Sequence, residues 1–417
     1  MHVLLIGAGA REHAIAWKLS RSPRLTRLSV APGNAGTARI ATNVDLDVGD
    51  PEAVARFCGS TNVGMVVVGP EVPLVAGLCD RLAARLPALR LVGPGAAGAR
   101  LEGSKAFSKA FMAEFDVPTA AYEAFTDDLA GARQFLRKLD PPYVLKADGL
   151  AAGKGVTIAA TLAEADAELG AMFGGKFGAA SRTVVIEEFL DGPEFSVFVL
   201  TDGRDYQLFP VARDYKRVGE GDTGPNTGGM GAISPVPSVD KHLMAKVRER
   251  IVERTLHGLR ERGIPYTGII FLGLIDVGGE PYVIEYNCRL GDPETEAVLP
   301  RVTTDLLGHF ESLFDGTLAQ TEIGVDSRAA ATVVMASGGY PGAYERGKPI
   351  TGLDDTGESI AFLAGVRAEG DRLLTDGGRV LAVTSFGQTG AEAAEESRRT
   401  LRGIAFEGGF FRGDIGR

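Results

Sequence analysis

The stretch Tyr266–Glu296, YTGIIFLGLIDVGGEPYVIEYNCRLGDPETE, sets two apolar runs on either side of a DVGGEP turn. Two such runs around a glycine turn predict a β-hairpin. Because successive side chains of a strand point to opposite faces, Glu285, Asn287 and Arg289 are expected on one face of its second strand. The other face is expected to carry Ile284, Tyr286 and Cys288. One surface of the hairpin therefore presents a carboxylate, an amide and a guanidinium.

These three polar groups suit a magnesium and phosphate site. Mg²⁺ takes oxygen ligands and usually shares its shell with substrate phosphates, and a guanidinium matches the spread charge of a transferring phosphoryl group. A solvated face of an edge strand is the commoner explanation of such a pattern taken alone. However, Asp292 and Pro293 predict the cap and the first residue of a helix directly after the strand. The polar face is thus expected at a strand end, where binding sites concentrate.

The length, composition and net charge of the chain limit the class of protein to which it can belong. A chain of 417 residues with 45% hydrophobic residues should hold two to four domains with well-filled cores. Its 44 basic and 54 acidic residues give a net charge of -10 without a basic block, which argues against a nucleic acid or an anionic membrane as partner. Three widely separated cysteines indicate neither a disulfide framework nor a metal cluster, and no apolar run reaches the length of a membrane helix. We expect a multidomain cytoplasmic protein that binds small molecules.

Residues 1–101 alternate short apolar strands with helical stretches, which predicts a parallel sheet covered by helices. The first turn, GAGAREH from Gly7 to His13, resembles a dinucleotide fingerprint. Because Glu12 replaces the third glycine and no acidic residue follows the next strand, NAD binding is not expected. The free amides of the loop, with Arg11 and His13 beside them, suit a single phosphate. For His13, a structural place in the helix is an open alternative.

Two further loops, Gly33-Asn34 and Gly69-Pro70-Glu71, follow other predicted strands. Because parallel strands end at one edge of a sheet, both loops are expected near the first glycine loop. Asn34 and Glu71 are the polar side chains that they would bring there. Ordinary turn chemistry explains either loop equally well when it is considered alone.

A glycine-rich loop from Asp148 to Gly155 joins two apolar strands and carries Lys154. It is not a Walker A loop, because the glycine spacing is one residue short and a strand follows instead of a helix. Such a hairpin can fold over a triphosphate as a flap, with Lys146 at the end of the entering strand. A mobile hairpin tip is the alternative. Lys105 opens an amphipathic helix and is a surface lysine unless the phosphate site lies beside it.

TVVIEEFL, residues 183–190, is a predicted strand that ends in two glutamates. Its end can offer backbone N–H and C=O groups to an adenine edge, with Glu194 near the ribose. For two adjacent glutamates a solvated turn is the commoner outcome.

The rest of the chain contains a glycine-rich stretch, a predicted helix and a C-terminal region of short predicted strands. Residues 213–232 have little apolar content and predict a long functional or disordered loop. Asp214 and Lys216 at its root suit a small charged substrate. Residues 240–263 predict a long amphipathic helix that ends at a glycine. Short strands with DGG turns in residues 328–417 predict a small β-rich domain that closes the site.

Ten segments carry a family resemblance in sequence order: GAGAREHA, APGNAGT, VGPEVPLVAG, LEGSKAFSK, KADGLAAGKGV, VIEEFLDGPEFS, DYKRVGEGDTGPNTGGMGA, VIEYNCRLGDPETE, ASGGYPGAYERGKPI and TDGGRVLAVT. The chain resembles the phosphoribosylamine–glycine ligases, or glycinamide ribonucleotide synthetases, of the ATP-grasp superfamily. The resemblance implies an α/β fold of three parts. These are an N-terminal parallel-sheet domain of pre-ATP-grasp, Rossmann-like type (1–102), a central ATP-grasp α+β domain (103–326) with a flap subdomain near 120–190, and a small β-rich C-terminal domain (327–417).

The resemblance also implies a role for each candidate site residue. The metal, Mg²⁺ or Mn²⁺, would be held by Glu285 and Asn287. The phosphates of ATP would meet Lys105, Lys146, Gly149, Gly153, Lys154 and Gly155. Its adenine and ribose would meet Glu187, Glu188, Phe189, Leu190 and Glu194. Phosphoribosylamine would be bound through its 5-phosphate and sugar by Gly9, Arg11, His13, Asn34 and Glu71. The reacting centre would be surrounded by Lys146, Asp214, Lys216, Arg289 and Asp292.

The implied reaction is amide formation between glycine and 5-phosphoribosylamine in purine biosynthesis, driven by ATP through glycyl phosphate, by a monomeric enzyme. Three departures stand out. GAGAREH replaces the more usual GNGGREH, Tyr215 stands where the family commonly has histidine, and the strand before the metal strand offers no carboxylate ahead of Asp276. The alternatives are a biotin-carboxylase-like or other ATP-grasp ligase acting on a different acid, and a nucleotide-binding regulatory protein.

Overall fold

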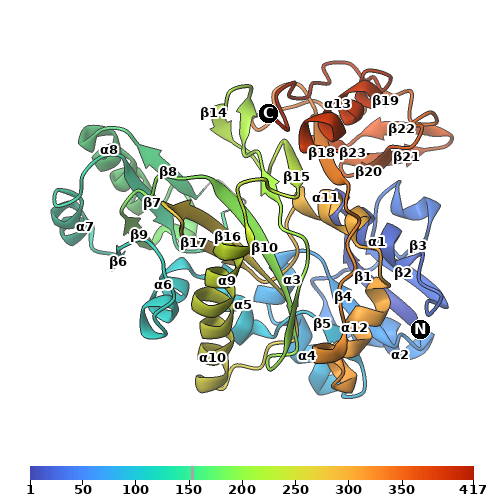
Figure 1. Ribbon diagram of the computed structural model, residues 1–417, viewed down its shortest axis with the longest axis horizontal. Helices are drawn as coiled ribbons and strands as arrows, with labels where there is room; N and C mark the ends of the chain where they lie inside the picture. The colour runs from blue at the N-terminus through green and yellow to red at the C-terminus, as the bar shows by residue number, and fades with distance from the viewer. Residues whose placement is uncertain (152–154) are drawn as a thin grey trace.

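The computed structural model describes residues 1–151 and 155–417. Its N-terminal part is a five-stranded sheet in the order β3-β2-β1-β4-β5 (Figure 1). All of its strand pairs are parallel, as predicted. The strands are β1 (His2–Gly7), β2 (Arg27–Pro32), β3 (Thr42–Asn43), β4 (Met65–Val68) and β5 (Arg90–Val92). The helices around them are α1 (Ala10–Leu19), η1 (Thr37–Arg39), α2 (Pro51–Thr61), α3 (Glu71–Val75), α4 (Leu78–Arg85) and α5 (Ala96–Gly103).

Strand β1 is buried along its whole length, because helices cover both faces of the sheet. Val3 and Leu5 belong to one core cluster, while Leu4 and Ile6 belong to another. The parallel register aligns the end of β1 with the ends of β2 and β4. The loops that follow these three strands therefore meet at one edge of the sheet.

The central part contains two antiparallel four-stranded sheets, β6-β9-β7-β8 and β11-β10-β16-β17. The first, with its helices, comprises α6 (Lys105–Glu114), β6 (Tyr122–Thr126), α7 (Leu129–Leu136), β7 (Tyr143–Ala147), β8 (Val156–Ala159), α8 (Leu162–Phe173), η2 (Gly178–Ser181) and β9 (Thr183–Glu187). The second comprises β10 (Glu194–Thr201), β11 (Tyr206–Leu208), α9 (Lys241–Val247), η3 (Arg248–Val252), α10 (Glu253–Glu261), β16 (Gly268–Val277) and β17 (Glu280–Asn287). After β17 come α11 (Glu294–Arg301), α12 (Leu306–Asp315) and η4 (Leu318–Gln320).

The predicted hairpin is confirmed as the antiparallel pair β16 and β17. Its turn needs glycine, since Gly278 and Gly279 have φ values of 63° and 88°. The pairing shifts between Gly273 and Leu274, which leaves Ile284 as an extra residue on β17. Val283, rather than Ile284, is therefore buried on the same face as Tyr286 and Cys288. The predicted face of Ile284 was wrong, because a β-bulge interrupts strict alternation.

The C-terminal part is built on the sheet β12-β15-β18-β23-β20, whose first two strands, β12 (Arg213–Asp214) and β15 (Gly231–Ser234), come from earlier in the chain. The smaller sheet β19-β22-β21 lies beside it. Its elements are β18 (Ala329–Ala336), β19 (Pro349–Ile350), β20 (Ile360–Leu363), β21 (Val366–Glu369), β22 (Arg372–Thr375), β23 (Arg379–Gly387) and α13 (Gly390–Leu401). In Figure 1 this part lies beside the N-terminal sheet, while the sheet β6-β9-β7-β8 lies at the opposite end of the molecule.

The glycine-rich stretch 213–232 is not the unpatterned loop that we predicted. It forms β12 (Arg213–Asp214), β13 (Arg217–Gly219), β14 (Thr223–Asn226) and β15 (Gly231–Ser234). Strand β15 pairs with β18, and β13 pairs with β14 as a two-stranded ribbon. Strand β15 is held by the distant β18, and β13 and β14 are held by their glycine-rich partners. Their local sequence therefore shows no apolar alternation that would predict strands.

Within the described ranges, no helix combines the length and apolar character needed to cross a membrane. The three cysteines are buried free thiols. The predicted helix at 240–263 is present as α9, a π-helical turn η3 and α10 in succession. It begins at Lys241 and is capped by Asp240, whose side chain accepts the Leu243 amide at 2.8 Å.

Candidate active site

The face of β17 that carries Glu285 and Asn287, here called the predicted metal face, lies beside two lysines from other elements. Glu285 and Asn287 are both half-buried on this strand. Lys146, from β7, donates to the carbonyl of Ile284 at 3.2 Å. Burial lowers the pKa of Lys105, and Glu285 is the nearby carboxylate that most opposes this shift. The structure thus brings together the predicted metal and phosphate residues of three separate elements.

Lys146 belongs to a buried triad of charged residues, together with Glu187 and Lys109. Glu187, which is 3% exposed, forms ion pairs with Lys146 Nζ at 2.9 Å through Oε1 and with Lys109 Nζ at 2.8 Å through Oε2. Burial raises the pKa of Glu187, but the two lysines outweigh it and the net shift is downward. Burial lowers the pKa of Lys109 to about 8. Sequence reasoning missed Lys109, whose signal was a second lysine one helical turn after Lys105.

The carboxylates of the predicted adenine segment already have partners within the protein. The carboxylate of Glu187 is used by the lysines, and Glu188 Oε1 accepts the Ala121 amide at 2.8 Å. Phe189 is 38% exposed and Leu190 is half-buried. The exposed ring of Phe189 offers an apolar surface, which suits the face of a purine.

The root of the glycine loop is tied to the start of α6. Ser104 Oγ donates to Asp148 Oδ1 at 3.0 Å, and the same carboxylate accepts the Ala106 amide at 2.7 Å. Lys105 Nζ lies 3.4 Å from the carbonyl of Gly149. Gly149 also packs on Ala180, where an added Cβ would come within 2.8 Å of the alanine Cβ. Gly155 accepts the Ala147 amide at 2.8 Å, whereas Gly153 and Lys154 lie outside the described residues.

Carboxylates crowd on the other side of the predicted metal face. Lys216 contacts Glu194 and lies 3.7 Å from Asp214. Burial lowers the pKa of Lys216, but Asp214 and Glu194 outweigh it and raise this pKa well above its usual value. Burial raises the pKa of Asp214, and it raises the pKa of Glu294 to about 7 with a further contribution from Asp214. Ser196 donates to Glu294 at 2.9 Å. The excess of acid groups favours a cation at this place.

Arg289 is turned toward the N-terminal part of the chain. Its Nη2 lies 2.8 Å from Glu102 Oε1, and its Nε lies 3.3 Å from Glu71 Oε2. Glu102 also accepts the Cys288 amide at 2.8 Å. Burial raises the pKa of Glu71, but the charges of Arg289 and Arg11 make the net shift downward. Arg289 therefore joins the end of β17 to α3 through Glu71 and to α5 through Glu102.

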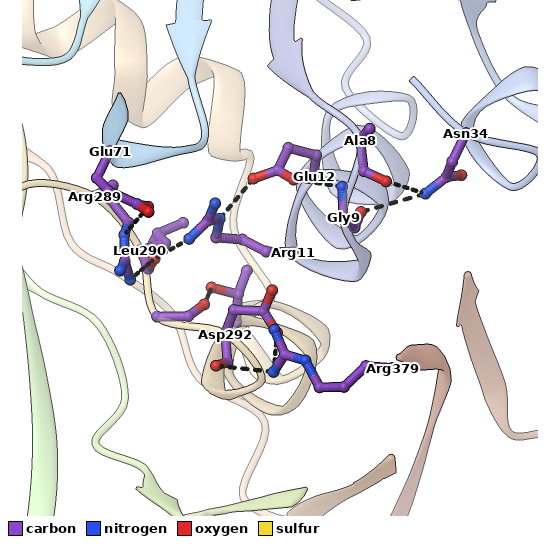
Figure 2. Close-up of polar contacts among 12 residues, drawn as sticks. Ala8, Gly9, Arg11, Glu12, Asn34, Glu71, Arg289, Leu290, Asp292 and Arg379 are labelled. Atoms are coloured by element: carbon purple, nitrogen blue, oxygen red, sulfur yellow. Dashed lines mark hydrogen bonds and ion pairs between the residues drawn. The ribbon is translucent and has the colours of Figure 1, made fainter. Parts of the chain in front are cut away.

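Figure 2 shows how Glu12 organises the first glycine loop. Its carboxylate accepts the Gly9 amide at 2.6 Å and Arg11 Nε at 2.6 Å. A Cβ at Gly7 or Gly69 would overlap the Glu12 side chain. Glu12, which stands where the fingerprint has its third glycine, thus packs closely against Gly7 and Gly69. Arg11 is 6% exposed, and its Nη1 donates to the Leu290 carbonyl at 3.3 Å.

His13 and Asn34 connect the N-terminal loops to β20. His13 Nδ1 accepts the Leu363 amide at 2.9 Å. Burial and the charge of Arg39 lower the pKa of His13 to about 4, so its imidazole is neutral at neutral pH. Asn34 Nδ2 donates to the Leu363 carbonyl at 2.7 Å and to the Ala8 carbonyl at 2.8 Å. These bonds give both residues a structural role, while their predicted substrate contacts stay a prediction.

A cavity of about 620 Å³ lies between the N-terminal loops, the turn after β17 and the C-terminal part. Three predicted substrate residues line it: Gly9, Asn34 and Asp292. The C-terminal part adds polar side chains that sequence reasoning missed: Tyr340, Arg367, Asp376 and Arg379. The DGGR sequence before β23 was the available signal for Arg379, because it sets an arginine directly after a glycine turn.

Asp292 does not cap the helix that follows it, so that prediction was wrong. Helix α11 begins after Pro293 without a side-chain cap. The Asp292 carboxylate is instead held by Arg379 Nη1 at 2.9 Å, as Figure 2 shows. The same nitrogen donates to the Gly228 carbonyl at 2.7 Å. Pairing with a distant arginine therefore outweighs the local capping preference.

Tyr215, a departure from the family pattern, has a partner near the end of the described chain. Its hydroxyl accepts the Gly416 amide at 3.1 Å. The guanidinium carbon of Arg412 lies 5.4 Å from its ring centroid. The tyrosine thus fastens the segment between Asp214 and Lys216 to residues 412–416.

Comparisons with known proteins agree along the whole chain. Family models described as the N, ATP-grasp (A) and C domains of phosphoribosylglycinamide synthetase match residues 1–102, 103–295 and 330–417. The chain is 49% identical to a phosphoribosylamine–glycine ligase of Rhizobium meliloti over 418 residues, which cover 100% of this chain and 98% of that protein. A homologue from Chlorobaculum tepidum is 47% identical and is covered to 99%.

Solved structures extend the comparison to the fold. The crystal structure of phosphoribosylamine–glycine ligase from Thermotoga maritima matches with a TM-score of 0.87 at 34% identity, with 100% of both chains covered. A biotin carboxylase from Campylobacter jejuni matches with a TM-score of 0.73 at 13% identity, covering 98% of this chain and 92% of that chain, which shows the shared fold alone. The chain is therefore a member of the phosphoribosylamine–glycine ligase family, built from its N, ATP-grasp and C domains.

Proposed function

We propose that this protein joins glycine to 5-phosphoribosylamine with ATP, giving glycinamide ribonucleotide, ADP and phosphate in purine biosynthesis. One observation carries the proposal. Strand β17, with Lys146 beside it, leads into the turn that ends in Asp292, and Asp292 lines the cavity of about 620 Å³. Two reactants held on either side of that turn can react as neighbours, which removes much of the entropic barrier.

ATP is proposed to lie along the edge formed by β7, β9 and β17. Its adenine would meet the backbone of residues 187–190 and the exposed Phe189. Lys105 and Lys146 would neutralise its phosphates, because both lie at the Glu285 end of β17. The glycine loop would cover the phosphates and keep water from the reacting group.

The residues present fit a hard divalent cation. Glu285 and Asn287 offer a carboxylate and an amide oxygen from one face of β17, and Mg²⁺ prefers oxygen ligands with water and phosphate completing its shell. No cluster of three histidine, cysteine or acidic residues able to hold a metal occurs in the described part of the chain. When bound, the ion would neutralise charge on the phosphates of ATP.

The chemistry follows from the weakness of a carboxylate as an electrophile. The glycine carboxylate attacks the γ-phosphorus of ATP, and ADP leaves. The amine of phosphoribosylamine then attacks the acyl carbon of glycyl phosphate, so that the C–N bond forms and phosphate leaves. Lys105, Lys146 and Arg289 are proposed to stabilise charge on the transferring group. Asp214 and Lys216 are proposed to flank glycine, because they lie on the acidic side of the predicted metal face.

The sugar phosphate is proposed to occupy the cavity, with its amine facing Asp292. The domain division at 1–102, 103–326 and 327–417, the monomeric state and the cytoplasmic location stay predictions. So do the individual roles proposed here for the site residues.

The first experiment measures ADP release with Mg-ATP, glycine and phosphoribosylamine formed in place from ribose 5-phosphate and ammonia. Each component is left out in turn, and the product mass is recorded. ADP that appears only with all components, together with the mass of glycinamide ribonucleotide, is the expected result. ADP release with another acid, or none with these substrates, would contradict the proposal and favour one of the alternatives.

A further inference from the structure

The charged side chains that line the cavity differ in how firmly they are paired within the protein. Of the described lining residues, Arg367 and Arg379 are the arginines, and Asp292 and Asp376 are the acids. Arg379 is fixed, since its Nη1 contacts the Asp292 carboxylate and the Gly228 carbonyl. Arg367 pairs with Glu369 at 2.9 Å, but both side chains are about half exposed, at 45% and 52%. Exposed pairs of this kind are weak, so the Arg367 guanidinium is available to a stronger anion.

The orientation of the substrate follows from the position of the predicted metal face. Asp292 lies five residues after Asn287, so it marks the end of the cavity that is nearest to the activated glycine along the chain. The amine must face that end to reach the acyl phosphate. The 5-phosphate, at the other end of the ribose, must then face away from β17. The C-terminal wall of the same cavity includes a cation, Arg367 in β21.

The arginine of the first loop is poorly placed for the same task. Arg11 and His13 do not belong to the described lining of the cavity. Arg11 is 6% exposed and is engaged by Glu12 and the Leu290 carbonyl, as Figure 2 shows. A phosphate that recruited Arg11 would have to compete with Glu12, whose carboxylate also holds the Gly9 amide. Stripping the partner from a buried charge is costly.

We propose that the 5-phosphate of the sugar-phosphate substrate is bound by Arg367 at the C-terminal wall of the cavity, while Arg11 and His13 hold the opposite wall in place. This inference rests on the proposed function, since it assigns one end of the proposed substrate. It makes the C-terminal domain the part that selects a phosphorylated sugar. A guanidinium suits this role because it can meet two phosphate oxygens at once.

The test uses ribose 5-phosphate as a stable probe and measures its binding by calorimetry to the wild type, Arg367→Ala and Arg367→Lys. Loss of a charge-assisted contact should weaken binding at least about tenfold in Arg367→Ala, with partial recovery in Arg367→Lys. The matched control is Arg372→Ala. Arg372 lies on β22, pairs with the same Glu369 at 3.5 Å and is 70% exposed. Its binding constant should stay within twofold of the wild type.

Two outcomes would overturn the inference. One is an Arg367→Ala protein that binds ribose 5-phosphate as tightly as the wild type. The other is an Arg11→Ala protein that keeps the wild-type melting temperature but loses binding, because Arg11 would then be the phosphate ligand.

The assay of ADP release separates this inference from the proposed function. If the wild type requires glycine and phosphoribosylamine, but Arg367→Ala leaves the KM for phosphoribosylamine unchanged, only the phosphate assignment fails. If the wild type forms no glycinamide ribonucleotide, the proposed function itself fails.

Discussion

Replacing Lys109 with methionine tests whether the buried triad supports the ATP site. The change removes one of the two cations on Glu187, whose side chain is 4% exposed. Breaking a buried pair by removing one partner costs about 3–5 kcal/mol, but Lys146 still faces Glu187. We therefore expect a loss of about 2–3 kcal/mol in the free energy of unfolding. Because Glu187 would then pair with Lys146 alone, less positive charge would face the phosphates, and the KM for ATP should rise.

A double-mutant cycle with Glu187→Gln isolates this pair. Urea unfolding is measured for the wild type, Lys109→Met, Glu187→Gln and the double variant. A neutral amide needs no second cation, so the double variant should lose at least about 1 kcal/mol less than the sum of the single variants. Lys138→Met is the control, because Lys138 is exposed on the same domain. Additive losses, or a KM for ATP equal to that of the wild type, would refute the reasoning.

Three further predictions follow from the site. Arg289→Ala should lower turnover roughly 10²- to 10³-fold, because it removes charge stabilisation and leaves Glu71 and Glu102 unpaired; unchanged turnover in the ADP assay would exclude that role. Between pH 4.5 and about 7, the folded wild type keeps a proton on Glu294 that the unfolded chain releases, so its free energy of unfolding falls as pH rises. Glu294→Gln should remove this dependence on pH. Urea unfolding across that pH range would show the difference. Tyr215→Phe should lose about 1 kcal/mol of stability with the Gly416 bond, and an unchanged urea midpoint would show that this bond contributes nothing.

Local sequence patterns predicted the parts of the fold that depend on residues close together in the sequence. The hairpin β16–β17 was predictable because alternation and a glycine turn are short-range signals. The parallel N-terminal sheet was predictable because strands and helices take turns along the chain. Lys105 was placed at a helix start, and Ser104 indeed caps α6 by accepting the Phe107 amide at 3.1 Å.

The errors share a physical origin in long-range pairing. Arg289 meets Glu71 across 218 residues, and no short motif encodes that contact. Asp292 has the sequence of a helix cap, yet it pairs with Arg379 of another domain. The bulge at Ile284 appears only when β17 is aligned with β16. In each case a partner brought by the tertiary fold outweighs the local preference.

The same long-range pairs explain how one site draws on three domains. Arg289 joins the end of β17 to α3 and α5, Arg11 joins the first loop to the Leu290 carbonyl, and Arg379 joins Asp292 to β23 (Figure 2). All three arginines therefore converge on the short turn between Asn287 and α11. That turn also separates the proposed ATP face from the proposed sugar cavity. A shift of any domain would move this turn, so we propose that these three contacts keep the two reactants aligned.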